Sequence, residues 1–306
     1  MSILVKIADL DLSNKIVLVR EDYNVPLENG EISDNTRITA TLPTLKQIQE
    51  AGAKIIIVSH LGRPEEGKYD EKFSLAPVAK ALSKNLEMEV PLIKDWVSGI
   101  DMSDKEIVLC ENVRFEIGEI SNNDDLSRKM AQLCQVYVND AFATSHRAQS
   151  STHGVAKYAA VSAAGPLLIK ELKALTRALR DPEKPIIAVI GGAKVSTKLT
   201  VLEVLYKKID KLILGGGIAN TFLKAAGYEI GKSLFEKDLV KTAEKIIKEA
   251  EKNNCDIPLP IDVITGESFD NNTIAKIKSL DEIQKNDMIM DVGPKTTKKL
   301  NEIITE

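Results

Sequence analysis

The chain has 306 residues and a mass of 33.6 kDa, with 43% hydrophobic and 28% charged residues. This length favours about two domains, and the composition is typical of a globular protein and excludes a disordered one. The formal net charge of −4 and the pI of about 5.7 argue against a nucleic-acid-binding surface, which needs a clustered positive face.

The N-terminus carries acidic residues where a secretory signal peptide needs basic ones, and no apolar run is long enough to span a bilayer. We therefore expect a cytoplasmic protein without membrane partners. The three cysteines, Cys110, Cys134 and Cys255, have no CxxC spacing, so they predict neither a disulfide framework nor a zinc site. We interpret them as buried reduced thiols.

Short runs rich in β-branched residues recur along the chain and are predicted to be strands. They span residues 15–20, 54–59, 106–111, 135–140, 185–190, 211–216 and 287–292. Continuous apolar runs of this kind are typical of strands covered on both faces. Helical patterns lie at residues 74–87, 124–134, 166–180, 197–208, 218–226 and 237–253. The alternation predicts an α/β fold with two doubly wound, parallel-sheet (Rossmann-like) domains.

The helical pattern at residues 166–180 ends at Asp181-Pro182, directly before a new strand. A helix followed by a breaker and a strand favours a domain boundary there. We expect an N-terminal domain at residues 1–170, an inter-domain helix or hinge at 171–184 and a C-terminal domain at 185–306. The lysine- and glutamate-rich helix at 237–253 is interpreted as a solvated face.

Arginine is rare and unevenly placed. The 41 basic residues comprise 33 Lys and 8 Arg, and half of the arginines fall in four short motifs of the first half, NTRIT, SHLGRP, ENVRF and SHRAQSS. The motifs carry Arg37, Arg63, Arg114 and Arg147, each close to a predicted strand. A guanidinium grips phosphate or carboxylate at two points, whereas lysine is a flexible point charge. The pattern predicts a small, multiply charged anion as ligand.

Other polar residues follow predicted strands, where open α/β sheets bind ligands. DYNVP at residues 22–26 offers a carboxylate and an amide, although, taken alone, the segment favours a turn with a side-chain cap. His60 lies in SHLGRP beside Gly62, so a ligand contact competes with a purely structural role.

Two glycine-rich segments follow strands of the second half. GGAKVSTKL at 191–199 places Lys194 and Lys198 four residues apart near a helix start, where backbone amides bind phosphates. GGGIANTFL at 215–223 would let adenine or ribose lie against the backbone. Ordinary capped turns remain alternatives for both. Neither segment has Walker A or GxGxxG spacing.

Seven motifs together, DYNVP, SHLGRP, ENVRF, NDAFATSHRAQSST, GGAKVSTK, GGGIANTF and DVGPKT, resemble the phosphoglycerate kinase family in order and separation. The resemblance covers residues 1–306. It implies a monomeric, hinge-bending enzyme of glycolysis with two lobes. Its reaction moves a phosphoryl group between 1,3-bisphosphoglycerate and ADP, giving 3-phosphoglycerate and MgATP.

The resemblance also implies roles for individual residues. Its substrate-binding residues are Asp22, Tyr23, Asn24, Arg37, His60, Leu61, Gly62, Arg63, Arg114 and Arg147. Its catalytic residues are Arg37, beside the transferred group, and Lys194, which follows the migrating phosphoryl. Its nucleotide-binding residues are Lys194 and Lys198 on the phosphates and Gly192, Gly216 and Gly217 beside the adenosine.

Family members continue past the position of Glu306, with a GGGDT loop that supplies the magnesium-binding Asp. The resemblance therefore implies that the C-terminal, nucleotide-binding domain at 185–306 is partial. We expect no metal ligand in this chain, with Mg²⁺ arriving bound to ATP or ADP. We also expect the chain to bind 3-phosphoglycerate but to turn over ATP poorly or not at all.

Two rival interpretations fit the sequence less well. An anion-binding or regulatory module without catalysis would have little use for Lys194 and Lys198. A nicotinamide-dependent dehydrogenase would need GxGxxG followed by an acidic residue about 20 positions later, and the chain has neither.

Overall fold

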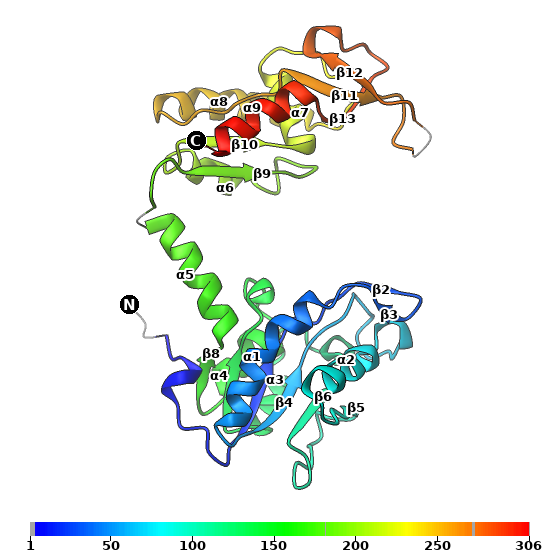
Figure 1. The fold of residues 1–306 in the computed structure, drawn as a ribbon, viewed down its shortest axis with the longest axis vertical. Coiled ribbons are helices and arrows are strands. Elements are labelled where there is room, and N and C mark those ends of the chain that lie inside the picture. Colours follow the sequence, from blue (N-terminus) through cyan, green and yellow to red (C-terminus); the bar gives the residue numbers. More distant parts are fainter. Residues whose placement is uncertain (1–3, 181, 271–272, 306) are drawn as a thin grey trace. The chain divides into compact units, whose positions relative to one another are not determined.

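The computed structural model describes residues 4–180, 182–270 and 273–305, so Asp181 of the expected breaker lies outside the described residues. The chain divides into two compact units, Met1–Leu175 and Thr176–Glu306 (Figure 1). Helix α5 (Pro166–Arg180) spans the boundary between them. Within the described part of the chain, no helix is both long and apolar enough to cross a membrane.

The first unit contains a six-stranded parallel sheet in the order β5-β6-β4-β1-β7-β8. Its strands are β1 (Ile16–Arg20), β4 (Lys54–Val58), β5 (Leu92–Ile93), β6 (Ile107–Cys110), β7 (Val136–Asn139) and β8 (Ser162–Ala164). A short antiparallel pair, β2 (Leu27–Glu28) and β3 (Glu31–Ile32), lies outside this sheet. The helices are α1 (Thr36–Glu50), α2 (Ala76–Leu86), α3 (Asp124–Gln132) and α4 (Val155–Tyr158), followed by α5.

Both faces of this sheet are buried, as the continuous apolar runs predict. On β1, Val17 and Val19 pack with residues of α1 and α2, whereas Leu18 packs on the opposite face with residues of α3 and α4. Successive strand side chains point to opposite faces, so an uninterrupted apolar strand fills two cores at once. The result is a helix–sheet–helix sandwich, which confirms the predicted α/β class.

Asp140, directly after β7, joins two helices of the first unit. Its Oδ2 accepts a hydrogen bond from the hydroxyl of Thr44 on α1, at 2.6 Å. Its Oδ1 accepts one from the backbone N–H of Leu168 in the first turn of α5, at 2.9 Å. The side chain is 2% exposed. Asp140 therefore fixes the start of α5 against α1.

The second unit has a parallel pair, β9 (Ile187–Ile190) and β10 (Lys211–Leu214), and an antiparallel sheet in the order β12-β11-β13. The strands of the latter are β11 (Asp262–Gly266), β12 (Lys276–Ser279) and β13 (Met288–Val292). The helices are α6 (Leu199–Leu205), α7 (Gly216–Ala225), α8 (Val240–Lys252) and α9 (Pro294–Thr305).

The seven predicted strands appear as β1, β4, β6, β7, β9, β10 and β13, with slightly shorter bounds. The expectation of parallel pairing is wrong for β13, which runs antiparallel to β11. Parallel neighbours need a long crossover connection, usually a helix. Only loops, β12 and the short turn Leu280–Glu282 separate β11 from β13, so antiparallel pairing is the geometry available.

Candidate active site

Four adjacent strands of the first sheet, in the order β6-β4-β1-β7, carry polar residues at their carboxyl ends. β1 leads to Asp22 and Asn24, β4 to His60 and Arg63, and the segments after β6 and β7 carry the remaining arginines of the motifs. The chain adds β4, β5 and β6 on one side of β1 and then β7 and β8 on the other. The edge beside β1 is thus a topological switch point, where α/β sheets form ligand crevices.

A cavity of about 220 Å³ opens at this edge, and we name it the arginine pocket. It is lined by Asp22, Asn24, Arg37, His60, Gly62, Arg63, Arg114, Ala143, Thr144 and Arg147. Segments that are far apart in the sequence thus bring all four motif arginines to one small cavity. Its size and its charge suit a compact polyanion.

Asp22 and Arg37 form an ion pair at the rim of the arginine pocket. Arg37 lies in the first turn of α1, and its Nη1 donates to Asp22 Oδ2 at 2.5 Å. Their side chains are 49% and 14% exposed. Asp22 Oδ1 also accepts a weak hydrogen bond from the backbone N–H of Asn24, at 3.2 Å. The Asp22 carboxylate therefore holds the half-exposed guanidinium of Arg37 at the rim.

Gly62 is held on both sides of its backbone. Its N–H donates to Asn24 Oδ1 at 2.8 Å, and its carbonyl accepts from Arg114 Nη1. Its φ of +60° is one that side-chain-bearing residues rarely adopt, and a Cβ here would lie 2.4 Å from the ring of Phe73. Glycine therefore permits the loop to pass between the two residues.

Arg114 is buried to 7% exposure, and Asn112 positions it. The Asn112 side chain accepts from the backbone N–H of Arg114 at 3.1 Å and donates to the carbonyls of Leu61 and Phe73. Burial and the nearby charges of other arginines lower the pKa of Arg114. Its Nε has no hydrogen-bond partner among the described residues, which leaves a buried donor available to an anion.

His60 is 3% exposed and lies between arginines and Asp22. Burial, followed by the charges of Arg20, Arg114, Arg147 and Arg37, lowers the pKa of His60 to about 2. The imidazole is therefore neutral at physiological pH and acts in this pocket as a hydrogen-bonding group, not as a cation.

Tyr23 and Leu61, which the resemblance implies as substrate contacts, belong to the hydrophobic core and do not line the arginine pocket. Tyr23 is 0% exposed, and its hydroxyl forms a 2.9 Å hydrogen bond with Thr41 on α1. The two residues support the loops whose neighbours reach the cavity.

Sequence reasoning missed Thr144, which lines the pocket, and Arg20, which lies buried next to His60. Arg20 ends the apolar strand β1 and is 1% exposed. A charged residue inside a predicted two-sided buried strand was the available signal, because such a charge needs an internal partner.

A second cavity, of about 370 Å³, lies in the second unit, and we name it the glycine pocket. It is lined mainly by glycine and apolar residues, among them Gly192, Ala193, Gly215, Gly216, Gly217, Ala219, Leu223, Val263, Met288 and Met290, with Asn220 and Asp291 as its polar members. The carboxyl ends of β9 and β10 and the N-terminus of α7 meet there. This lining suits a flat, largely apolar group such as a nucleobase.

The two glycine segments of the second unit pack backbone against backbone. A Cβ on Gly217 would lie 2.4 Å from the carbonyl oxygen of Ala193, and one on Gly216 would lie 2.9 Å from that of Gly192. Gly216 also has a φ of +63°. No larger residue fits this approach without displacing a loop.

Lys194 and Lys198 are exposed on the loop before α6, and Lys198 is its N-terminal capping residue. Neither side chain is among those that line the glycine pocket. Ser196 in the same loop is bound through its N–H and hydroxyl to Glu236, at 2.8 and 2.6 Å. The loop is thus fixed, and its two lysines remain accessible to solvent.

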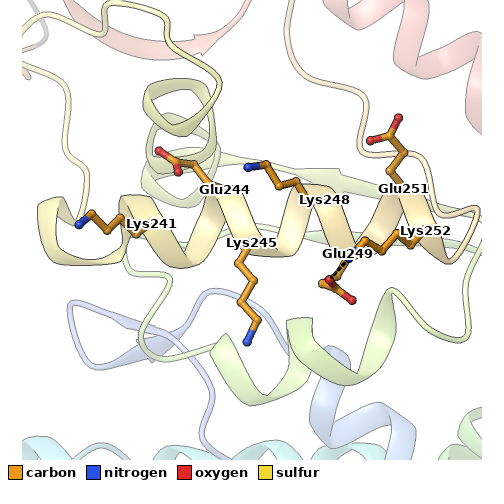
Figure 2. A pocket seen from close by; sticks show the side chains of 7 residues that line it. All are labelled: Lys241, Glu244, Lys245, Lys248, Glu249, Glu251 and Lys252. Carbon is orange, nitrogen blue, oxygen red and sulfur yellow. Dashed lines mark hydrogen bonds and ion pairs between the residues drawn. The ribbon is translucent and has the colours of Figure 1, made fainter.

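A further surface hollow follows helix α8 and is lined by lysines and glutamates of that helix (Figure 2). Its lining residues are Lys241, Glu244, Lys245, Lys248, Glu249, Glu251 and Lys252. Lys252 donates to Glu249 at 2.7 Å, and the other side chains in Figure 2 point outward from a single helix. Mixed charge on one helix is typical of a solvated face, as predicted.

Across residues 4–180, 182–270 and 273–305, no three His, Cys, Asp or Glu side chains are grouped as metal ligands. Cys110, Cys134 and Cys255 are buried and free, as expected.

The first unit has an arginine-lined anion cavity at a sheet switch point, and the second unit has a glycine-lined pocket. This combination is typical of an α/β enzyme that transfers a phosphate group. The family profile of phosphoglycerate kinase matches residues 7–306. Phosphoglycerate kinase of Legionella pneumophila (strain Lens) is 54% identical over 303 residues, covering 99% of this chain and 76% of the relative. That of Coxiella burnetii (strain RSA 493 / Nine Mile phase I) is 52% identical over 290 residues, covering 95% and 74%.

Solved structures agree with these relatives. Phosphoglycerate kinase from Coxiella burnetii matches with a TM-score of 0.86 at 50% identity, covering 99% of this chain and 77% of that chain. The enzyme from Pyrococcus horikoshii OT3 matches with a TM-score of 0.80 at 30% identity, covering 98% and 78%. The chain belongs to the phosphoglycerate kinase family.

Proposed function

We propose that this chain carries out reversible phosphoryl transfer between 1,3-bisphosphoglycerate and ADP, giving 3-phosphoglycerate and ATP. The single observation that carries the substrate assignment is the convergence of four arginines on one cavity of about 220 Å³. Membership of the phosphoglycerate kinase family supports the reaction. The same membership supports a place in glycolysis, a cytoplasmic location and a monomeric state.

The arginine pocket divides into two parts with different chemistry. Arg63, Arg114 and Arg147 bind the 3-phosphate, because planar guanidinium groups match phosphate oxygens and stay charged at all physiological pH values. His60 adds a neutral hydrogen bond. Asp22 accepts a hydrogen bond from the glycerate hydroxyl, and the side-chain amide of Asn24 donates one to the glycerate carboxylate.

Arg37 lies at the rim and acts on the group that is transferred. Phosphoryl transfer needs in-line positioning and neutralisation of charge on the equatorial oxygens, with little covalent help from the protein. Arg37 is about half exposed and is held by Asp22, so its remaining donors are free to reach a group above the pocket. Its interaction grows as charge develops in the transition state.

The nucleotide is assigned to the second unit. Gly192, Gly216 and Gly217 supply a backbone shelf for adenosine, and Lys194 and Lys198 bind the phosphates, with Mg²⁺ entering as part of the nucleotide complex. Lys194 follows the migrating phosphoryl. Because Arg37 and Lys194 belong to different units, both act on one phosphoryl only when the units close during the reaction, with residues 171–184 as the hinge.

Calorimetry of the chain with 3-phosphoglycerate tests the substrate assignment, and glycerate, which lacks the phosphate, is the matched ligand. We expect glycerate to bind on the order of 100-fold more weakly, since it forfeits the charge-assisted contacts of the arginines. Equal affinity for both ligands would overturn the assignment.

A coupled assay with 3-phosphoglycerate and MgATP tests the reaction. We expect any ADP formation to be slow, to depend on both substrates and to be lost in Lys194→Ala. ADP formation that does not require 3-phosphoglycerate, or that persists in Lys194→Ala, would contradict this reaction.

A further inference from the structure

A chain of buried hydrogen bonds lies behind the arginine pocket. It runs from Glu119 through Ser151 and Arg20 to the ring of His60, and each of its four residues is at most 3% exposed. The proposed function uses only His60, the last member. Glu119 and Ser151 do not line the arginine pocket, and the resemblance implies no role for either, although Ser151 lies in the SHRAQSS motif.

The direction of every hydrogen bond in this chain is determined by chemistry. Arg20 has only donors, so its Nε donates to Ser151 Oγ at 3.0 Å and its Nη2 donates to His60 Nδ1 at 3.2 Å. The Ser151 hydroxyl, which accepts from Arg20, has its own hydrogen free for Glu119 Oε1 at 2.6 Å. The backbone N–H of Ser151 donates to Glu119 Oε2 at 2.9 Å.

The hydrogen bond from Arg20 determines the tautomer of the His60 imidazole. A nitrogen that accepts from a guanidinium cannot carry a proton, so the proton of neutral His60 is on Nε2. Asp22 Oδ1 lies 3.8 Å from the same nitrogen, which is too long for a hydrogen bond. In addition, Asp22 already accepts from Arg37. Asp22 would become the partner of Nδ1–H if Arg20 were displaced.

Arg20 stays in place because all three nitrogens of its guanidinium group donate hydrogen bonds. Besides Ser151 and His60, it donates through Nη1 to the backbone carbonyl of Glu21. Burial raises the pKa of Glu119, while the hydrogen bonds from Ser151 and the charge of Arg20 lower it. Both carboxyl oxygens of Glu119 accept hydrogen bonds, an arrangement that the ionised form satisfies.

We propose that Glu119 and Ser151 are positioning residues that hold Arg20 against His60, so that the imidazole presents Nε2–H to the bound anion. The positioning role follows from hydrogen bonds within the chain itself, whereas the identity of the anion, 3-phosphoglycerate, rests on the proposed function. The role is to select one tautomer of a neutral ring, because the other tautomer would offer a lone pair to a negatively charged ligand.

Nitrogen NMR of ¹⁵N-histidine-labelled, ligand-free chain reports the tautomer directly. The chain has three histidines, so the His60 signals are assigned with His146→Gln and His153→Gln. We expect wild-type His60 to be protonated on Nε2 alone. In Ser151→Ala and in Glu119→Gln, Arg20 loses its anchor, and we expect the Nδ1–H form to appear as the ring turns its proton toward Asp22.

Ser150→Ala is the matched control. Ser150 is the neighbouring residue and is equally buried, but its hydroxyl bonds to the carbonyls of Gly118 and Asn123, not to Arg20. Its loss of hydrogen bonds resembles that of Ser151→Ala, so a general loosening of the fold would affect both variants. We expect Ser150→Ala to keep the wild-type tautomer.

Affinity for 3-phosphoglycerate gives the second measurement. We expect Ser151→Ala and Glu119→Gln to bind it about tenfold more weakly than Ser150→Ala, the loss of one charge-assisted hydrogen bond. A wild-type His60 protonated on Nδ1, or an unchanged tautomer in both Ser151→Ala and Glu119→Gln, would overturn the inference. If the tautomer changes as expected but neither the wild type nor any variant binds 3-phosphoglycerate, the proposed function fails and the positioning role stands.

Discussion

The arginine pocket and the glycine pocket are built from different parts of the polypeptide. In the first unit, charged side chains from four strand ends line the cavity. In the second unit, glycine backbone and apolar side chains line it. Side chains can be shortened without steric conflict, so the arginine pocket is vulnerable to loss of atoms. Glycine has no side chain to truncate, so the glycine pocket is vulnerable to added atoms.

The largest effect is expected for Arg37→Ala, which removes a charge at the rim of the arginine pocket. We predict that kcat falls about 100-fold, roughly 3 kcal/mol of transition-state stabilisation, with a small change in KM for 3-phosphoglycerate. Steady-state kinetics in the coupled assay measures both constants. A near-normal kcat with a raised KM would assign Arg37 to ground-state binding and not to catalysis.

The next effect is expected for Arg147→Ala, in the part of the pocket assigned to the phosphate. We predict that binding of 3-phosphoglycerate weakens by about 1.5–3 kcal/mol, since one charge-assisted contact is lost. Arg128→Ala is the matched control, because Arg128 stacks on the ring of Tyr158 outside the pocket. Calorimetry with equal affinities for the two variants would contradict the role of Arg147.

In the glycine pocket, the informative change adds an atom. Gly217→Ala places a methyl group 2.4 Å from the Ala193 carbonyl, and we predict a loss of about 1–3 kcal/mol in stability together with weaker binding of ADP. Gly191→Ala is the control, because a Cβ there meets nothing within 4 Å. Urea unfolding that fails to separate the two variants would show that the loops are not tightly packed.

The smallest effect concerns pH. The unfolded chain protonates His60 near pH 6.5, whereas the pKa in the folded chain is about 2, so only the unfolded state takes up this proton as the pH falls below about 6.5. The free energy of unfolding should therefore fall, by up to about 1.4 kcal/mol per pH unit for this group. We predict a shallower fall in His60→Asn, measured by urea unfolding at several pH values. Parallel curves would place the acid sensitivity elsewhere.

Much of the fold follows from local sequence signals, and the failures have identifiable causes. The buried strands were predictable because their apolar runs fill two cores. Helix α1 was missed because Pro43 lies inside it, and an internal proline argues against a helix. Strands β5 and β8 were missed because they are only two and three residues long.

The site was predictable where residue type and strand position coincided, as for Arg63 and Arg114. The position of Arg37 on the first turn of a helix and its pairing with Asp22 were not, because they depend on the missed helix α1. The hydrogen-bond chain from Glu119 to His60 joins residues separated by up to 131 positions, and no local pattern reports such a distance in sequence.

The neutral state of His60 has a consequence for the thermodynamics of ligand capture. The positive charge of the arginine pocket comes from guanidinium groups, which do not titrate in the physiological range. If neither His60 nor the arginines exchange protons with solvent on binding, the heat of 3-phosphoglycerate binding carries no contribution from buffer ionisation by these groups. The arginine pocket therefore keeps its positive charge when the pH changes within the physiological range.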